Sequence, residues 1–244
     1  MDWDNDGNLD ILSGCYWTEG KDGGHIQILH GKGGLDFAES ESLLNASGEA
    51  LQNIKIDNPD NKPIVDNQTE AICTEQHAVD YDGDGDLDLV VGCFANSFFL
   101  YVNEGNETEP KLGEPSLLPV ASPAHHAAPH LADWDGDGDL DLLSGTSQGG
   151  VLISDNEGTR AKPVWSKFKQ LVSPSNQRSQ SVTADGPVAP APSTRVWVTD
   201  WNRDGKLDLL VGDSVSLKSG NEDSSASSTS ATTRTGFVWL YLRK

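Results

Sequence analysis

Short apolar stretches recur along this chain, and each one follows a strongly acidic stretch. The apolar stretches cover residues 11–14, 89–92, 142–145 and 209–212, and each ends in glycine. Leucine and β-branched residues over three or four positions, stopped by glycine, are typical of short buried strands. The loop-to-strand order also differs from that of EF-hand and dockerin loops, which continue into an amphipathic helix. The pattern therefore predicts an all-β repeat protein.

Around the two central copies, the pattern extends to four short strands. The expected strands of the second copy cover 73–79, 87–92, 98–102 and 111–119, and those of the third cover 129–132, 140–144, 150–154 and 164–172. Glycine, asparagine and proline separate them, as in a meander of strands. Four strands in about 60 residues are typical of one blade of a β-propeller.

The copies start 78, 53 and 67 residues apart, which divides the chain into units 1–72, 73–125, 126–193 and 194–244. The first unit lacks a strand before its loop, and the fourth ends at its third strand, 236–242. The strands at the two ends of the chain do not combine into one complete blade. We therefore expect a partial, open propeller. The alternatives are that the start of the sequence is wrongly assigned, or that several chains assemble to complete the ring.

Each acidic stretch is a nine-residue loop, at 2–10, 80–88, 133–141 and 200–208. Side-chain oxygens at alternate positions, then a turn glycine and a further Asp, suit Ca²⁺, which takes six to eight oxygen ligands in flexible geometry. Mg²⁺ fits less well because it demands tighter octahedral geometry. We expect up to four calcium ions with a structural role.

By analogy with other acidic calcium loops, ligands come from the side chains at loop positions 1, 3, 5 and 9 and the carbonyl at position 7. The fourth loop has only three carboxylates and contains Arg203, so it should bind most weakly. The expected ligands are Asp2, Asp4, Asp6, Asn8 and Asp10; Asp80, Asp82, Asp84, Asp86 and Asp88; Asp133, Asp135, Asp137, Asp139 and Asp141; and Asp200, Asn202, Asp204, Lys206 and Asp208.

The line D-x-D-G-D-G-x-x-D-L-x-x-G resembles the FG-GAP/VCBS-type repeat of integrin α-subunit propellers and of many secreted bacterial proteins. Segments 103–110 and 156–163 are similar to that family's N-x-G turn before the outer strand. The resemblance implies a calcium-binding β-propeller. It implies no single activity, because propellers host many functions.

The chain of 244 residues has a formal net charge of −21, and 17 of its 38 acidic residues lie in the four loops. The basic footprint of a nucleic-acid-binding protein is absent, and no apolar run approaches the length of a membrane span. The three cysteines, at 15, 73 and 93, do not make a disulfide framework. We expect a secreted or cell-surface protein whose export signal lies upstream of this sequence.

If the loops share one face, the longest connections gather on the opposite face. These are 46–72, 173–194 and 213–235, expected to be irregular, and they mark either a binding face or tolerated insertions. His77, His130 and Trp197 share one register on the innermost strands, where a core or hydrogen-bonded role is expected. Aromatic residues at loop position 2 should pack between blades; they are Trp3, Tyr81, Trp134 and Trp201.

Signatures of catalysis are missing: there is no G-x-S-x-G, H-E-x-x-H or P-loop sequence. The sequence therefore favours a non-enzymatic module for binding or adhesion, with an unknown protein or carbohydrate ligand. The alternative is the propeller portion of a polysaccharide-active enzyme, a lyase or a hydrolase.

Overall fold

The computed structural model describes residues 1–15, 24–51, 74–94, 96–175, 179–181, 189–218 and 232–244. Seventeen strands occur in these residues. In chain order they are β1 (Ile11–Gly14), β2 (Ile26–Leu29), β3 (Glu41–Ser42), β4 (Glu75–Val79), β5 (Asp88–Gly92), β6 (Ser97–Tyr101), β7 (Ser116–Ala121), β8 (Ala128–Ala132), β9 (Asp141–Gly145), β10 (Val151–Ser154), β11 (Lys169–Val172), β12 (Ser179–Ser181), β13 (Arg195–Thr199), β14 (Asp208–Gly212), β15 (Val215–Lys218), β16 (Thr232–Thr235) and β17 (Val238–Tyr241). The described part forms no helix that could cross a membrane.

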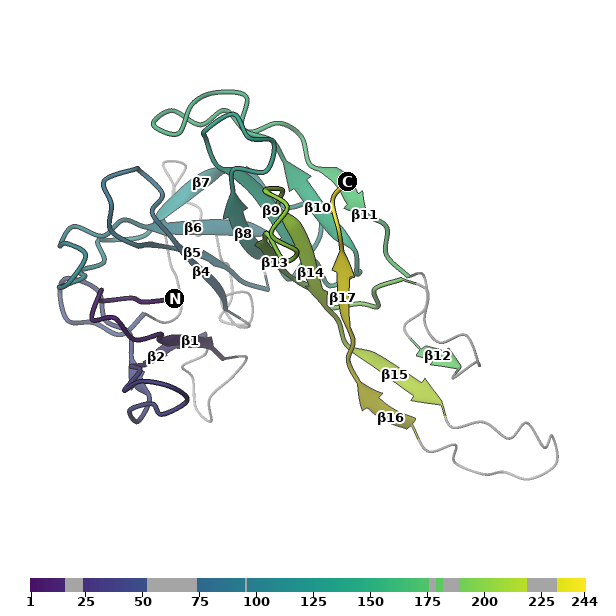
Figure 1. The fold of residues 1–244 in the computed structure, drawn as a ribbon, viewed down its shortest axis with the longest axis horizontal. Helices are drawn as coiled ribbons and strands as arrows, with labels where there is room; N and C mark the ends of the chain where they lie inside the picture. The colour runs from purple at the N-terminus through teal and green to yellow at the C-terminus, as the bar shows by residue number, and fades with distance from the viewer. Residues whose placement is uncertain (16–23, 52–73, 95, 176–178, 182–188, 219–231) are drawn as a thin grey trace, which may run out of the picture.

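Four antiparallel sheets follow one another along the chain and act as blades (Figure 1). Blade 1 is β1-β2-β3, blade 2 is β4-β5-β6-β7, blade 3 is β8-β9-β10-β11, and blade 4 is β13-β14-β17. The innermost strands of successive blades are in contact: β1 with β4, β4 with β8, and β8 with β13. The expected all-β architecture of a partial propeller is confirmed, with complete four-stranded blades at the two central copies.

The segments expected to be irregular contain a further small sheet, which the sequence analysis missed. β15 and β16 form an antiparallel hairpin, and β12 pairs with β15 in parallel. Valine, leucine and threonine occur in β15 and β16, and their high β-propensity outweighs the polar composition of the segment; β12, which pairs with them, is Ser-Gln-Ser. Most of 46–72 lies outside the described residues.

The outer strands of the central blades are shorter than expected because asparagine side chains hold the preceding turns. Asn103 Oδ1 accepts hydrogen bonds from the amides of Gly105 and Lys111, and Asn156 Oδ1 accepts them from Gly158 and Val164. These amides are therefore not available for hydrogen bonds between strands. Pairing with the outer strand consequently begins later in the sequence, at β7 in blade 2 and at β11 in blade 3.

Apolar side chains from facing blades form three continuous cores. Blades 1 and 2 share the first, blades 2 and 3 the second, and blades 3 and 4 the third. Typical members of these cores are Ile28 with Phe99, Phe98 with Leu142, and Ile153 with Val211. The surfaces that adjacent blades turn toward each other are apolar and buried, and burial of this surface drives the stacking of the blades.

The glycine that ends the second strand of a blade is required by the close approach of the next blade. A Cβ on Gly92 would lie 1.9 Å from the carbonyl oxygen of Ala127, and a Cβ on Gly145 would lie 2.2 Å from that of Thr194. Both distances are too short for any side chain. Among the described residues, none has an atom within 4 Å of the Cβ position of Gly212 in blade 4.

The outward face of blade 4 is open at the same register. In blade 3, Leu143 and Ile153 pair across β9 and β10 and are fully buried against blade 4. The equivalent row of blade 4 is Trp197, Leu210 and Leu240, with Trp197 53% and Leu240 42% exposed. This apolar row matches the one that blade 3 buries against blade 4; Trp197 packs against His130 of blade 3, and no further blade covers the row among the described residues.

We predict that Gly145→Ala destabilises the protein by about 2–3 kcal/mol or more, because the methyl group would collide with the Thr194 backbone. Gly212→Ala is the matched control and should change the free energy of unfolding by no more than about 0.5 kcal/mol. Urea unfolding followed by circular dichroism measures both. Equal losses for the two variants would show that the glycine serves the strand and not the interface.

Candidate functional site

The aspartate at loop position 9 holds each blade together at its acidic end. Asp88 is buried, and its carboxylate accepts hydrogen bonds from the amide of Tyr81 at 2.8 Å and that of Asn103 at 2.7 Å. Tyr81 is loop position 2, and Asn103 follows the third strand of the blade by two residues. The same two bonds recur in the other three blades, at Asp10, Asp141 and Asp208. One buried carboxylate therefore joins the loop to the third strand.

Backbone amides curl around the remaining carboxylates. Asp133 accepts bonds from the amides of Gly136 and Gly138, and Asp137 accepts one from Asp139. Gly136 and Gly138 have φ of +85° and +97°, which side chains rarely adopt. This backbone conformation directs the acidic side chains toward the centre of the loop.

Acidic oxygens converge in the first three loops. Ligand atoms lie within 4.8 Å of one another in the groups Asp2, Asp4 and Asp6; Asp80, Asp82 and Asp88; and Asp133, Asp135 and Asp137. Among the described residues, the fourth loop forms no such group. Three of the five expected site residues converge in each of loops 1 to 3, and the spacing allows one cation in each; Asp84 and Asp86 of loop 2 and Asp139 and Asp141 of loop 3 lie outside these groups.

Several buried oxygens in these loops have no hydrogen-bond partner in the described part of the molecule. They are Oδ1 of Asp4, Asp86 and Asp139. Asp86 and Asp139 occupy position 7, where the sequence predicted only a carbonyl ligand. Each side chain therefore adds a free carboxylate oxygen that a cation could satisfy, since an unpaired buried polar atom is costly.

Burial and mutual repulsion oppose ionisation of the carboxylates in the absence of a cation. Burial raises the pKa of Asp88 to about 6, although the amides of Asn103 and Tyr81 favour the ionised form. Burial, and then the charges of Asp84 and Asp82, raise the pKa of Asp86. Because the folded-state pKa of Asp88 is raised, its contribution to stability is present at low pH and is lost as the pH rises through about 6, where the buried carboxylate ionises. A divalent cation beside the carboxylate would offset this cost of ionisation.

Arginines from the following blade touch two of the loops. Arg160 of blade 3 lies 3.2 Å from Asp80 Oδ1 and donates to the carbonyl oxygens of Asp80 and Tyr81. Arg243 of blade 4 donates to the Trp134 carbonyl, and its guanidinium lies 4.9 Å from the Trp134 ring. The loops therefore also contribute to contacts between blades.

The aromatic residues at loop position 2 pack between blades where a next blade is present. Trp3 is buried in the first core, Tyr81 packs on the second, and Trp134 on the third. Trp201 is 58% exposed, since blade 4 has no neighbour in the described structure. Packing between blades, as expected, accounts for three of the four.

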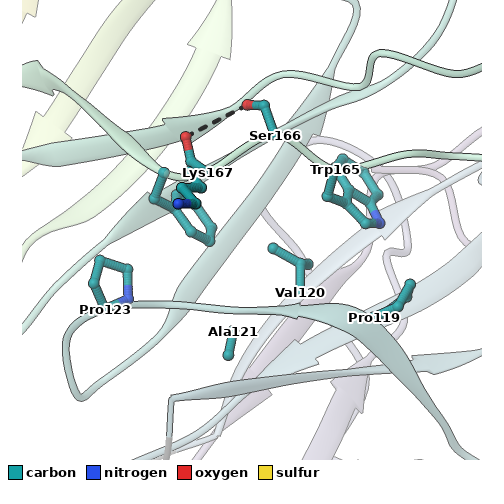
Figure 2. A pocket seen from close by; sticks show the side chains of 8 residues that line it. Pro119, Val120, Ala121, Pro123, Trp165, Ser166 and Lys167 are labelled. Carbon is teal, nitrogen blue, oxygen red and sulfur yellow. Dashed lines mark hydrogen bonds between the residues drawn. The ribbon is translucent and has the colours of Figure 1, made fainter.

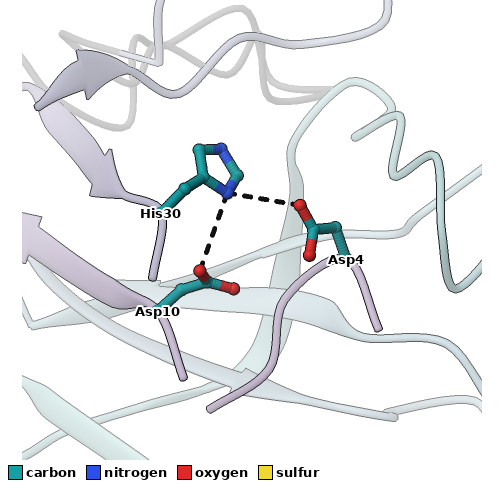
Figure 3. A group of neighbouring side chains, drawn as sticks. All are labelled: Asp4, Asp10 and His30. Atoms are coloured by element: carbon teal, nitrogen blue, oxygen red, sulfur yellow. Dashed lines mark ion pairs between the residues drawn. The ribbon is translucent and has the colours of Figure 1, made fainter. Parts of the chain in front are cut away.

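His30 lies beside the first loop, where the sequence analysis did not place it. Its Nδ1 is 3.3 Å from Asp4 Oδ2 and 3.6 Å from Asp10 Oδ1 (Figure 3). Its Nε2 is 3.5 Å from Glu41 Oε1. The missed signal is positional: His30 directly precedes Gly31, whose amide bonds to Asp10.

Two histidines of the innermost strands connect adjacent blades, as the shared register suggested. His77 Nε2 bonds to the Leu131 carbonyl oxygen at 3.2 Å, and the Val198 amide donates to His130 Nε2 at 3.2 Å. The two rings lie 3.9 Å apart, and Trp197 packs edge-on against His130. Burial lowers the pKa of His77 to about 4 and that of His130 well below its usual value. Both are hydrogen-bonded core residues.

A shallow groove of about 470 Å³ lies between the outer parts of blades 2 and 3. Figure 2 shows the segment with Trp165 and Ser166 facing the strand with Val120 and Ala121. Trp165 Nε1 is buried without a hydrogen-bond partner in the described structure. The lining residues are Pro119, Val120, Ala121, Pro123, Trp165, Ser166, Lys167 and Phe168. The groove offers aromatic and apolar contacts and one cation, Lys167.

We predict that His77→Gln flattens the acid dependence of stability. Because the folded-state pKa of His77 is lowered to about 4, its contribution is complete above pH 6.5 and is lost as pH falls toward 4, a change of about 3 kcal/mol. Gln keeps a donor for Leu131 but does not titrate. Urea unfolding between pH 7 and pH 4 measures the slope.

The exposed His125 provides the control for this substitution. His125→Gln removes one imidazole without removing a buried one, so the slope should match that of the unmodified protein. An identical slope for His77→Gln would contradict the assignment.

The family of FG-GAP-like repeats matches the chain at residues 80–144 and 133–211. Among solved structures, one similar chain is a lectin from Agrocybe aegerita, described for its specific recognition of non-reducing terminal N-acetylglucosamine. The two are 15% identical with a TM-score of 0.36, over 96% of this chain and 71% of the lectin. No curated protein sequence matches significantly.

Proposed function

The chain belongs to the FG-GAP-like repeat family, and from this we propose that it is a calcium-stabilised propeller segment that acts as a binding or adhesion module outside the cell. One observation carries the proposal: three loops each gather three carboxylate side chains within 4.8 Å. Carboxylates so close together repel one another unless a cation lies between them. Their oxygen-only donor sets suit Ca²⁺.

The role proposed for calcium is structural. Each loop links two strands of its blade, and loops 2 and 3 also contact the following blade, through Arg160 and Arg243 respectively. With a Kd near the 10⁻⁴ M typical of extracellular modules and about 2 mM calcium, each occupied loop adds roughly 2 kcal/mol. Several loops together are comparable with the whole stability of a domain, about 5–15 kcal/mol.

Ligand binding is assigned to the groove between blades 2 and 3. Trp165 and Phe168 provide flat aromatic surface, and Lys167 provides a cation at the edge of the groove. Such a combination suits a protein segment or a carbohydrate, because both offer apolar faces together with hydrogen-bond acceptors. No catalytic step is proposed.

We predict that removing calcium lowers the melting temperature and that adding it back restores the original value. Asp82→Asn should reduce the calcium-dependent increment, because it removes one charge from loop 2 and keeps an oxygen that can bond to the Asp84 amide. Differential scanning calorimetry in EDTA and in 2 mM calcium measures the increment, and isothermal titration calorimetry counts the sites.

Glu107→Gln is the matched control, since Glu107 is an exposed acid outside the loops. It should leave the increment unchanged. A melting temperature that does not respond to full chelation would overturn the calcium proposal.

We predict that the protein depletes a subset of polysaccharides or extracellular proteins from solution without cleaving them. Trp165→Ala removes the aromatic surface of the groove and should weaken retention by roughly tenfold, as expected for loss of one aromatic contact. A pull-down panel scored in parallel for new reducing ends or unsaturated products measures both properties. Product release above background would instead support the polysaccharide-active alternative.

A further inference from the structure

His30 gives blade 1 a donor that the other blades lack beside their acidic loops. It directly precedes the residue whose amide bonds to the ninth-position Asp, Gly31 in blade 1. By the same bond, the corresponding residues of the other blades are Val102, Asp155 and Leu242. In the part of the chain that the structure describes, an imidazole therefore lies next to the acidic loop of blade 1 alone.

We propose that blade 1 binds a transition-metal ion of the zinc class through Asp4, Asp10 and Nδ1 of His30. One ligand atom from each of these side chains lies within 4.8 Å of the other two. The Nδ1 atom lies between the two carboxylates, at 3.3 and 3.6 Å (Figure 3). Zinc bonds of about 2.0–2.1 Å in tetrahedral geometry place neighbouring ligand atoms about 3.3–3.4 Å apart, close to this spacing.

The surroundings of His30 favour a metal ligand over an ordinary ion pair. Both distances exceed the roughly 2.7–2.9 Å of a charge-assisted hydrogen bond. The Glu41 carboxylate faces Nε2 at 3.5 Å, so Nδ1 is the ring nitrogen directed at Asp4 and Asp10. A carboxylate behind a ligating imidazole is the usual outer support of a zinc site.

Asp4 and Asp10 are suited to the same role. Asp10 is buried and held in place by the amides of Trp3 and Gly31, so its orientation is fixed before any ion binds. Asp4 has a buried Oδ1 without a partner in the described structure. A fixed carboxylate, an unsatisfied carboxylate and an imidazole form a mixed nitrogen and oxygen donor set.

This donor set selects against calcium. Ca²⁺ takes oxygen ligands, and imidazole suits Zn²⁺, Co²⁺, Ni²⁺ and Cu²⁺. Loops 2 and 3 offer only oxygen. The zinc-class ion would share Asp4 with the calcium proposed for loop 1 and compete with it there, whereas loops 2 and 3 hold no such second set of ligands among the described residues. The inference stands or falls independently of calcium in loops 2 and 3.

The test titrates the chelator-treated full chain with Co²⁺ and follows its visible d–d absorption, to which bound calcium does not contribute. We expect about one equivalent of nitrogen-coordinated Co²⁺, displaced by Zn²⁺. His30→Val, which places the residue of blade 2 at this position, should abolish the band. Glu41→Gln should weaken the affinity about 10- to 100-fold.

His25→Val, a second histidine of the same blade outside the cluster, should leave the spectrum unchanged. Because His30→Val could also disturb folding, ¹⁵N NMR of the unmodified protein gives a second readout: the Nδ1 resonance of His30 should shift when Zn²⁺ is added. An Nδ1 that does not shift, or a cobalt band that survives His30→Val, overturns the proposal and leaves His30 as a polar neighbour of two carboxylates. Calcium titration of the same variants separates this failure from that of the calcium proposal.

Discussion

A single buried carboxylate in each blade determines how the acidic loop, the second strand and the third strand fit together. The aspartate at loop position 9 lies at the start of the second strand, with its two oxygens bonded to two amides that are far apart in sequence. In blade 3, Asp141 receives the amides of Trp134 and Asn156. Two hydrogen bonds offset much of the cost of burying the charge, although burial still raises the pKa of Asp141. Without this bond pattern the loop could not be held against its own sheet.

The stacking of blades depends on a second constraint, the distance between neighbouring backbones. The carbonyl of the strand that opens the next blade lies where the Cβ of the terminal glycine would be, at Gly92 and at Gly145. The inner-strand histidines fix the same approach from the other side, because His77 and His130 bond to the backbone of the following blade. In blade 4, on which no further blade packs in the described structure, the equivalent positions are Gly212, whose Cβ position is open, and Trp197, whose ring is half-exposed.

Charge accumulates where the geometry is most constrained, and this links the fold to its proposed chemistry. The loops concentrate negative charge over short turns that the backbone holds in place. Repulsion between the carboxylates lowers the stability of the folded protein, and a bound cation would offset that loss. The four loops are not chemically equal. Loop 1 has an imidazole close by, loops 2 and 3 hold additional buried carboxylates at Asp86 and Asp139, and loop 4 contains Arg203 and Lys206.

The sequence by itself determined the repeat, the four-stranded blades, the loop residues and the register of the inner-strand histidines, because each follows from local spacing and alternation. It could not place His30 beside Asp4 and Asp10, since that contact joins the end of β2 to the loop before β1. Nor could it show the groove under Trp165, the hairpin of β15 and β16, or the atom that makes Gly145 necessary. These features arise only when strands distant in sequence are packed, because close approach, burial and unsatisfied polar atoms are properties of neighbours in space.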